Sequence, residues 1–192
     1  MIVTVNGKDF EIVENANLTG ANLTGVDFTG ADDDDFFAVN FTGANLTGAN
    51  FTGLNLCKTN FTNADLTDAN LTNAELKFAI LNNTRFFCTN LTGVELSYKD
   101  LTDSIFYRAN FTNADLHDAD LSYHDLHNCN FTGANLIGVN FTGANLTGAN
   151  FTGANLIHAN MCNAIFYDNL KNANMTCARN YKAFDWETYY NV

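Results

Sequence analysis

Large apolar residues recur at every fifth position through most of this 192-residue chain. The register runs unbroken from Phe41 to Phe166, with Leu or Phe at every position except Met161, and earlier members stand at Leu18, Leu23 and Phe28. A period of five fits neither an α-helix, with its period of 3.6, nor the two-residue alternation of a flat strand. The pattern therefore predicts a solenoid with a bend in every repeat, in which each coil packs on its neighbours.

A typical repeat reads Ala44-Asn45-Leu46-Thr47-Gly48. The small residue and the large one stand two positions apart, so in extended backbone both side chains point inward and the Asn between them points outward. Gly and Asn accept the positive φ that a sharp bend requires, and they are frequent at the fifth position. Four such bends would close a square coil.

The phrase A-[N/D]-[L/F]-x-x, repeated in tandem over most of the chain, closely resembles the pentapeptide-repeat proteins. This resemblance implies an all-β fold, a right-handed quadrilateral β-helix of about eight coils. With coils at the usual strand spacing, the body would be a rod of roughly 35 to 40 Å.

Both ends depart from the repeat, as the ends of a solenoid must. Residues 1–14 predict an N-terminal β-hairpin cap around Asn6-Gly7, and residues 15–177 form the repeat body, with a register slip before Leu170. Residues 178–192 concentrate aromatic side chains in a predicted short C-terminal helix, which either caps the last coil or forms a homodimer interface. The candidate residues of this segment are Tyr181, Phe184, Trp186, Tyr189 and Tyr190.

A second departure lies between Phe28 and Phe41, whose spacing of 13 residues indicates a three-residue insertion. We expect residues 31–38 to form an acidic loop. It carries Asp32, Asp33, Asp34 and Asp35. These carboxylates are interpreted as a solvated charge run, a recognition element or a loose cation site, although no EF-hand spacing accompanies them.

One side of the predicted coil is uniform, with Asn and Thr at the outward positions from Asn50 to Thr152. The simplest interpretation is a ladder of hydrogen bonds along the stack. The alternative, an ice-binding plane, rests on the regular spacing alone, because Asn is the common residue at this position.

The middle coils are less regular. Phe87 and Tyr107 share one outward column with His127, and Phe78 and Tyr98 share another. With nearby basic residues these rings suggest a protein-binding site, although drift of the repeat explains them equally well. The candidate binding residues are Phe78, Arg85, Phe87, Tyr98, Tyr107 and Arg108.

Lys99 and His124 occupy the inward slot that normally holds a small residue. Burying a charge is costly, so we expect the coil to widen there and the polar tips to reach solvent.

The sequence offers no catalytic constellation. His117, His124, His127 and His158 fall on different faces of the predicted coil, so they cannot converge on a metal or a nucleophile. A core filled by Leu and Phe also lacks an apolar pocket. We therefore predict no enzyme activity, no catalytic residues, no metal and no cofactor.

The net charge of −12, from 21 acidic and 9 basic residues, disfavours direct binding to nucleic acid or anionic membranes. The sequence has no apolar run that could span a membrane and no signal peptide at Met1. Five cysteines without regular spacing favour free thiols, so we expect a cytoplasmic protein.

The family resemblance also suggests a partner. Some pentapeptide-repeat proteins mimic DNA, dimerise through a C-terminal segment and bind DNA gyrase or topoisomerase IV. The acidic balance fits that role, whereas most outward positions here are neutral Asn and Thr. The alternative is an interaction scaffold that uses the central aromatic residues or the C-terminal segment.

Overall fold

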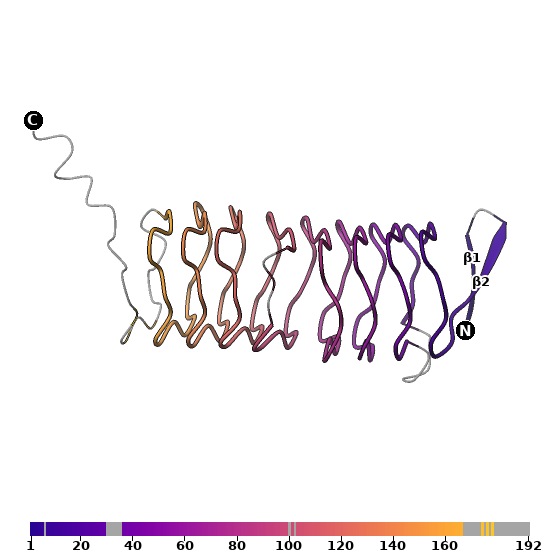
Figure 1. Cartoon of the computed structure of the whole chain (residues 1–192), viewed down its shortest axis with the longest axis horizontal. Coiled ribbons are helices and arrows are strands. Elements are labelled where there is room, and N and C mark those ends of the chain that lie inside the picture. Colours follow the sequence, from indigo (N-terminus) through magenta and orange to yellow (C-terminus); the bar gives the residue numbers. More distant parts are fainter. Residues whose placement is uncertain are drawn as a thin grey trace, which may run out of the picture.

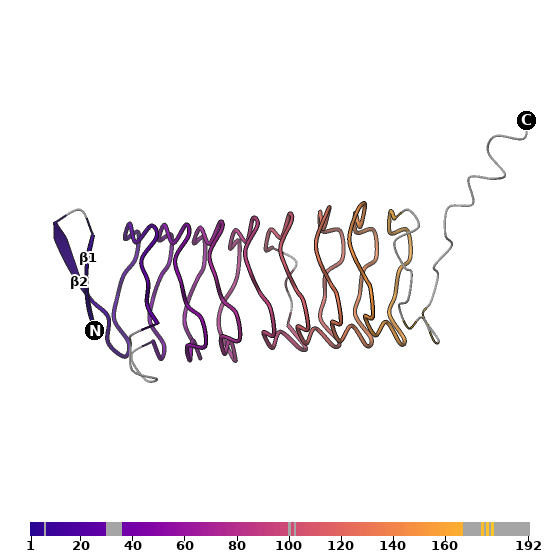
Figure 2. The same cartoon turned by 180° about the vertical axis from the view of Figure 1, so that it is seen from behind.

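The computed structural model describes residues 1–5, 7–29, 36–99, 101, 103–166, 174, 176 and 178. These residues stack into a rod of coils that runs from an N-terminal hairpin toward the C-terminal end (Figure 1). The view from behind shows the same order of coils, with the hairpin at one end (Figure 2).

The hairpin consists of strand β1 (Ile2–Val5) and strand β2 (Lys8–Glu11), paired antiparallel as the sequence predicts. Gly7 in the connecting turn has φ 75°, a conformation that Gly adopts without strain. Val3 lies opposite Phe10, and both side chains are buried in the core that the repeats share. The hairpin is therefore packed against the first coil.

The described residues after β2 form isolated parallel bridges rather than long strands. Most of these bridges join residues 20 positions apart, as Asn50 to Asn70 and Asn70 to Asn90. Twenty residues are four pentapeptides, so each coil has four sides and each side repeats one coil further on.

The repeats that the structure describes contain the expected bend. In the repeat around Phe41, the N–H of Ala44 donates to the carbonyl of Phe41 at 2.9 Å. The fifth residue, Gly43, has φ 64°, and larger residues adopt the same conformation in other repeats, as Asn63 does with φ 60°. Gly and Asn are therefore frequent at this position because they tolerate the positive φ that the bend requires, as the sequence suggested.

The core is a column of Leu, Phe and small residues. Phe41, Leu46 and Phe51 are fully buried. Aromatic rings stack from coil to coil, and the ring centroids of Phe131 and Phe151, for example, are 5.0 Å apart. Such offset stacking adds a little to the hydrophobic stabilisation of each coil interface.

The register shows where the insertion lies. Asn17 bridges Asn40 and Asp27 bridges Asn50, an offset of 23 residues instead of 20. The Phe36 side chain is only 1% exposed and takes the central position of a repeat. The loop is therefore shorter than the expected range of residues 31–38. Its last three residues belong to the next repeat, because the large Phe36 ring fills the inward position.

Near the other end, Asn155 bridges Asn174, an offset of 19 residues that agrees with the predicted slip. The predicted C-terminal helix, apart from residue 178, lies outside the described residues, as do Asp32 to Asp35. No helix in the described part of the chain has the length and apolar character needed to cross a bilayer.

Candidate interaction surfaces

The outward Asn residues are used by the fold itself. The side-chain oxygen of Asn110 accepts the backbone N–H of Thr112 at 3.1 Å and its hydroxyl at 2.6 Å. The amide nitrogen of Asn110 donates to Asn90 and Thr92 in the coil below, at 3.2 and 3.1 Å. The predicted ladder of hydrogen bonds along the uniform side is thus confirmed, and it engages the polar groups of that side.

Asp replaces Asn in the same role. The carboxylate of Asp120 accepts the N–H of Ser122 at 2.9 Å and the side-chain amide of Asn140 at 3.1 Å. Partial burial pushes the pKa of Asp65 upward, but hydrogen bonds from Thr67 and Arg85 hold it below the usual value. Much of the negative charge on the coils therefore also stabilises bends.

An ordered row of side chains, which we call the ring strip, runs along one corner of the middle coils. It consists of Arg85, Phe87, Tyr107 and His127. The guanidinium of Arg85 lies 5.8 Å from the Phe87 ring centre, Phe87 lies 6.0 Å from Tyr107, and Tyr107 stacks at 5.8 Å on His127 with an interplanar angle of 4°. Arg85 is also tied to Asp65 by a 2.6 Å ion pair.

Phe78 and Tyr98 form a second aromatic site, which we call the exposed pair. Their exposed fractions are 66% and 72%. Lys77 Nζ lies 5.4 Å from the Phe78 ring centre, and Tyr98 meets His117 edge-on at 4.6 Å. The structure gives no ring contact between Phe78 and Tyr98 themselves.

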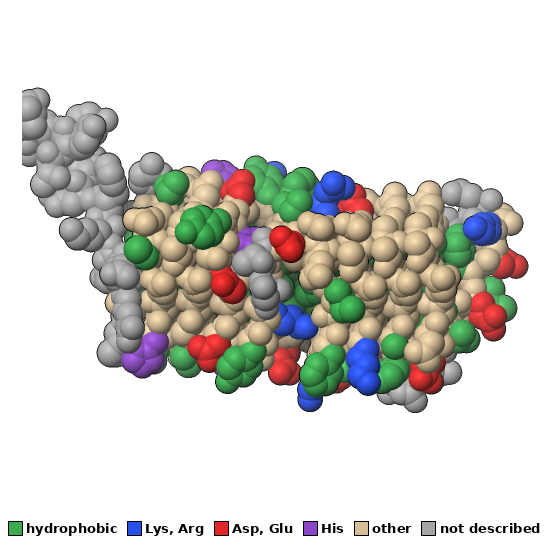
Figure 3. Space-filling view, viewed as in Figure 1, with side chains coloured by type: hydrophobic (Ala, Val, Ile, Leu, Met, Phe, Trp, Pro, Cys, Tyr) green, Lys and Arg blue, Asp and Glu red, His purple; other side chains and the backbone are tan. Residues whose placement is uncertain are grey.

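The ring strip and the exposed pair are separate surfaces. Phe78 and Phe87 lie in repeats whose central residues are ten positions apart. Ten residues are half of a 20-residue coil, so the two side chains lie on opposite sides of the rod. Hydrophobic side chains accordingly appear along both the upper and the lower edge of the middle coils (Figure 3). Arg108, next to Tyr107, is exposed on the ring-strip side.

Several inward slots hold polar side chains, and each finds a backbone partner. Thr89 Oγ1 donates to the Leu66 carbonyl at 2.7 Å, and Cys129 Sγ donates to the Phe106 carbonyl at 2.9 Å. Burial raises the pKa of the Cys129 thiol to about 12, which makes it a poor nucleophile.

Lys99 and His124 are the largest polar residues in these slots. Lys99 Nζ donates to the Ala79 carbonyl at 3.1 Å, and burial lowers the pKa of this amine. His124 is 6% exposed, with Nε2 2.7 Å from the Leu101 carbonyl and Nδ1 3.0 Å from the Ser122 carbonyl. The expectation that the tip of His124 reaches solvent is therefore wrong, because two carbonyl groups hold the ring inside.

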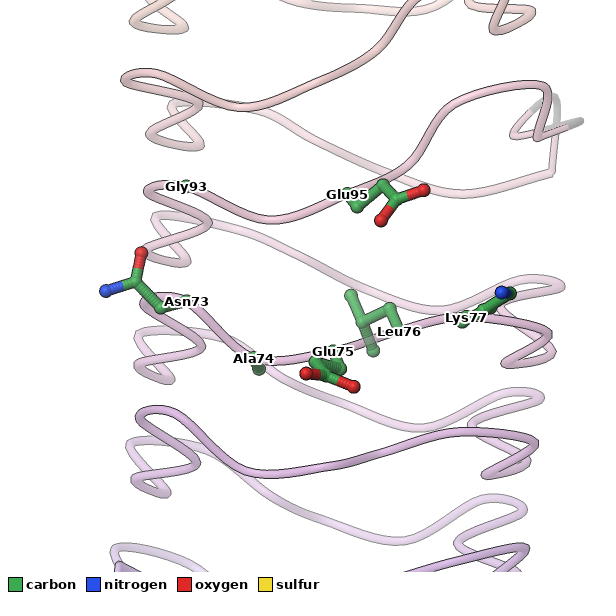
Figure 4. A pocket seen from close by; sticks show the side chains of 7 residues that line it. All are labelled: Asn73, Ala74, Glu75, Leu76, Lys77, Gly93 and Glu95. Carbon is green, nitrogen blue, oxygen red and sulfur yellow. The ribbon is translucent and has the colours of Figure 1, made fainter.

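A hollow of about 330 Å³ lies between two coils beside the exposed pair. Glu75 and Glu95 line it from two successive coils, and Gly93 lies near Asn73 at its other end (Figure 4). The repeat pattern does not reveal this hollow, although Lys99 in an inward slot indicates a widened coil.

Other predicted site residues are not brought together. Among the described residues, no group of three or more His, Cys, Asp or Glu side chains could hold a metal ion. The candidates Asp32 to Asp35, and those of the aromatic segment from Tyr181 to Tyr190, lie outside the described residues.

Comparisons with known proteins agree with this architecture. The family model for pentapeptide repeats matches residues 13–32, 35–73, 49–86, 69–106, 84–122, 100–133 and 129–166. No curated protein matches the chain in sequence.

One solved structure shows the same type of fold. A trypsin-treated form of QnrB1, a plasmid-mediated fluoroquinolone resistance protein, is 18% identical with a TM-score of 0.53, over 83% of this chain and 78% of the other. HetL, a pentapeptide repeat protein involved in heterocyst differentiation regulation from the cyanobacterium Nostoc sp. strain PCC 7120, is 23% identical with a TM-score of 0.43, over 86% and 87% of the two chains.

Proposed function

Because the chain belongs to the pentapeptide-repeat family, whose members fold as right-handed quadrilateral β-helices, we propose that it is a non-catalytic scaffold that binds a protein partner. The proposal includes a capping role for residues 1–14, a repeat body over residues 15–177 and a separate aromatic segment over residues 178–192. The main support for this function is the ordered arrangement of side chains in the ring strip.

The ring strip has the properties of a binding site. Phe87 and Tyr107 are half-buried by their neighbours, so their rings are held in place before a partner arrives. Preorganised aromatic and Arg side chains are the residues that most often dominate protein interfaces. Arg108 adds an exposed cation that makes no ion pair among the described residues.

A paired capture experiment tests this role. We expect proteins captured by the wild-type chain to be lost, by about tenfold or more, when Phe87→Ser and Tyr107→Ser are combined. The matched control is Phe78→Ser with Tyr98→Ser, which removes two rings from the opposite side. Equal capture by all three chains would exclude the ring strip as the binding site.

A second candidate is an acidic DNA mimic that binds a type II topoisomerase such as DNA gyrase. The supporting observation is a set of four carboxylates in three successive repeats of one coil, in a chain of net charge −12. They are Asp115, Asp118, Asp120 and Asp125.

Gyrase supercoiling assays across a salt series test the mimic. Wild type should inhibit at micromolar concentration and lose inhibition steeply as salt rises, because the contact would be electrostatic. Asp118→Asn with Asp125→Asn should weaken inhibition and leave the fold intact, since Asn occupies the same positions in other repeats. Absence of inhibition at low salt would rule out this candidate.

A further inference from the structure

The ladder of backbone hydrogen bonds between coils is interrupted at two places within the described residues. In a regular step, Leu56 N–H donates to the Glu75 carbonyl at 2.9 Å. The equivalent bond from Leu76 to Glu95 is missing, and so is the return bond from the Glu95 N–H to Ala74. At the next step between coils, and on the opposite side of the rod, the bonds from the Phe106 N–H to the Asp125 carbonyl and from the Asp125 N–H to the Ser104 carbonyl are missing as well.

The first interruption lies beside Lys99. In regular coils the carbonyl below an inward slot accepts a backbone N–H, as the Thr59 carbonyl accepts the N–H of Ile80 at 2.9 Å. The equivalent carbonyl below the slot of Lys99 is that of Ala79, and it accepts a hydrogen bond from the Lys99 ammonium. The long side chain of Lys99 thus occupies space between two coils that Ala or Val leaves free.

The second interruption lies around His124. Its ring contacts the Leu101 carbonyl in the coil below and the Phe106 ring, whose centre is 5.7 Å away. The slot directly beneath it holds Ser104, which is small. An imidazole in this slot separates the two strands that would otherwise pair, and the backbone amides on each side lose their partners.

The openings are local, because the Asn side stays closed. Bridges continue from Asn70 through Asn90 and Asn110 to Asn130 without a break. Figure 4 shows the same asymmetry, since Gly93 lies next to Asn73 whereas the ribbon at Glu95 has moved away from the coil below. The coil in the middle of the rod therefore stays attached along the Asn side, and each opening is confined to another part of the coil. Arg85 still bridges Ile105 at the first step, and Glu95 still bridges Asp115 at the second.

We propose that Lys99 and His124 act as wedges that make the coil between them a flexible joint, at which the two halves of the rod tilt relative to each other. Phe78 and Tyr98 lie on the two edges of the first opening, so the joint sets the spacing of the exposed pair. The ring strip crosses a closed step, where Cys88 N–H donates to the Tyr107 carbonyl at 3.0 Å. The rod thus has one fixed aromatic surface and one that adapts to a partner.

Amide hydrogen exchange of the full chain, followed by NMR, tests the wedges. In the wild type, the amides of Leu76, Glu95, Phe106 and Asp125 should exchange about tenfold or more faster than their bonded equivalents one coil away. Lys99→Ala should slow exchange at Leu76 and Glu95 alone. His124→Ala should slow it at Phe106 and Asp125 alone.

Thr84→Ala is the matched control. It changes an inward polar residue whose hydroxyl donates to the Phe61 carbonyl at 2.9 Å, beside a closed ladder. This variant should leave the exchange of all four amides unchanged. Equal protection of the four wild-type amides and their bonded equivalents would overturn the proposal, as would fast exchange that persists in both wedge variants.

Residual dipolar couplings test the hinge directly. In the wild type, residues 40–75 and 126–166 should fit two different alignment tensors, because the halves move relative to each other. In the Lys99→Ala, His124→Ala double variant they should fit one. A single tensor in the wild type would show a rigid rod and refute the joint. Ala fills the same slot at Ala119 and Ala144, so the double variant retains a normal repeat.

Discussion

At the scale of the residue, the fifth position of each repeat imposes the left-handed backbone conformation on whatever side chain occupies it. Phe78, with φ 59°, and Tyr123, with φ 61°, adopt it although bulky residues pay a steric cost there. The conformation was predictable from the frequency of Gly and Asn. The consequences for stacking were not, because they depend on which side chain lies in the coil below.

Gly53 and Gly93 distinguish the cost of the backbone conformation from the effect of contacts with the neighbouring coil. Both have positive φ, of 71° and 69°, but an added Cβ at Gly53 would meet nothing within 4 Å, whereas at Gly93 it would collide with the side-chain oxygen of Asn73. We expect Gly53→Ala to lower the free energy of unfolding by about 1 kcal/mol, the cost of the backbone conformation alone. Gly93→Ala should cost slightly more in the same urea titration, because the amide group of Asn73 must turn aside.

The Asn73→Gly background supplies the control. Without the Asn73 side chain, Gly93→Ala should fall to the cost of Gly53→Ala, since two residues in contact couple and distant ones add. If Gly93→Ala costs the same with and without Asn73, the collision does not determine the choice of Gly at this position.

At the scale of the element, much of the fold follows from short-range signals. The Asn6-Gly7 pair predicted the hairpin, and spacing alone located the insertion before Phe41 and the slip after Phe166. Each of these depends on a local turn or on the five-residue register, which a sequence displays directly.

The candidate surfaces were only partly predictable. The columns that contain Phe87 and Phe78 follow from the register, but the contacts within them depend on side-chain rotamers, such as the parallel stacking of Tyr107 on His127. The interrupted ladder depends on how far a slot can expand around Lys99, which is a question of packing between coils rather than of pattern.

At the scale of the whole molecule, the core differs along the rod. On the Asn side, the central residues are Phe28 and Phe51 near the N-terminal end and Phe111, Phe131 and Phe151 toward the other end. Leu71 and Leu91 lie between them. Phe28 stacks on Phe51 at 4.8 Å, but no ring continues this stack through the middle coils. Among the described residues, the buried ring contacts therefore form two groups. One ends at Phe61, and the other begins at Phe86, which stacks on Phe106 at 5.0 Å.

This division predicts two units of unfolding. Coils contact only their neighbours, so a core mutation destabilises nearby coils first. Phe51→Ala and Phe151→Ala each remove a fully buried ring from the same side of the coil, and each should cost roughly 3–5 kcal/mol in its own half. In native-state hydrogen exchange at low urea, Phe51→Ala should accelerate exchange in residues 17–75 and spare residues 126–166, and Phe151→Ala should do the reverse. If either variant accelerates exchange equally in both halves, the rod unfolds as one cooperative unit and the middle coils transmit stability in full.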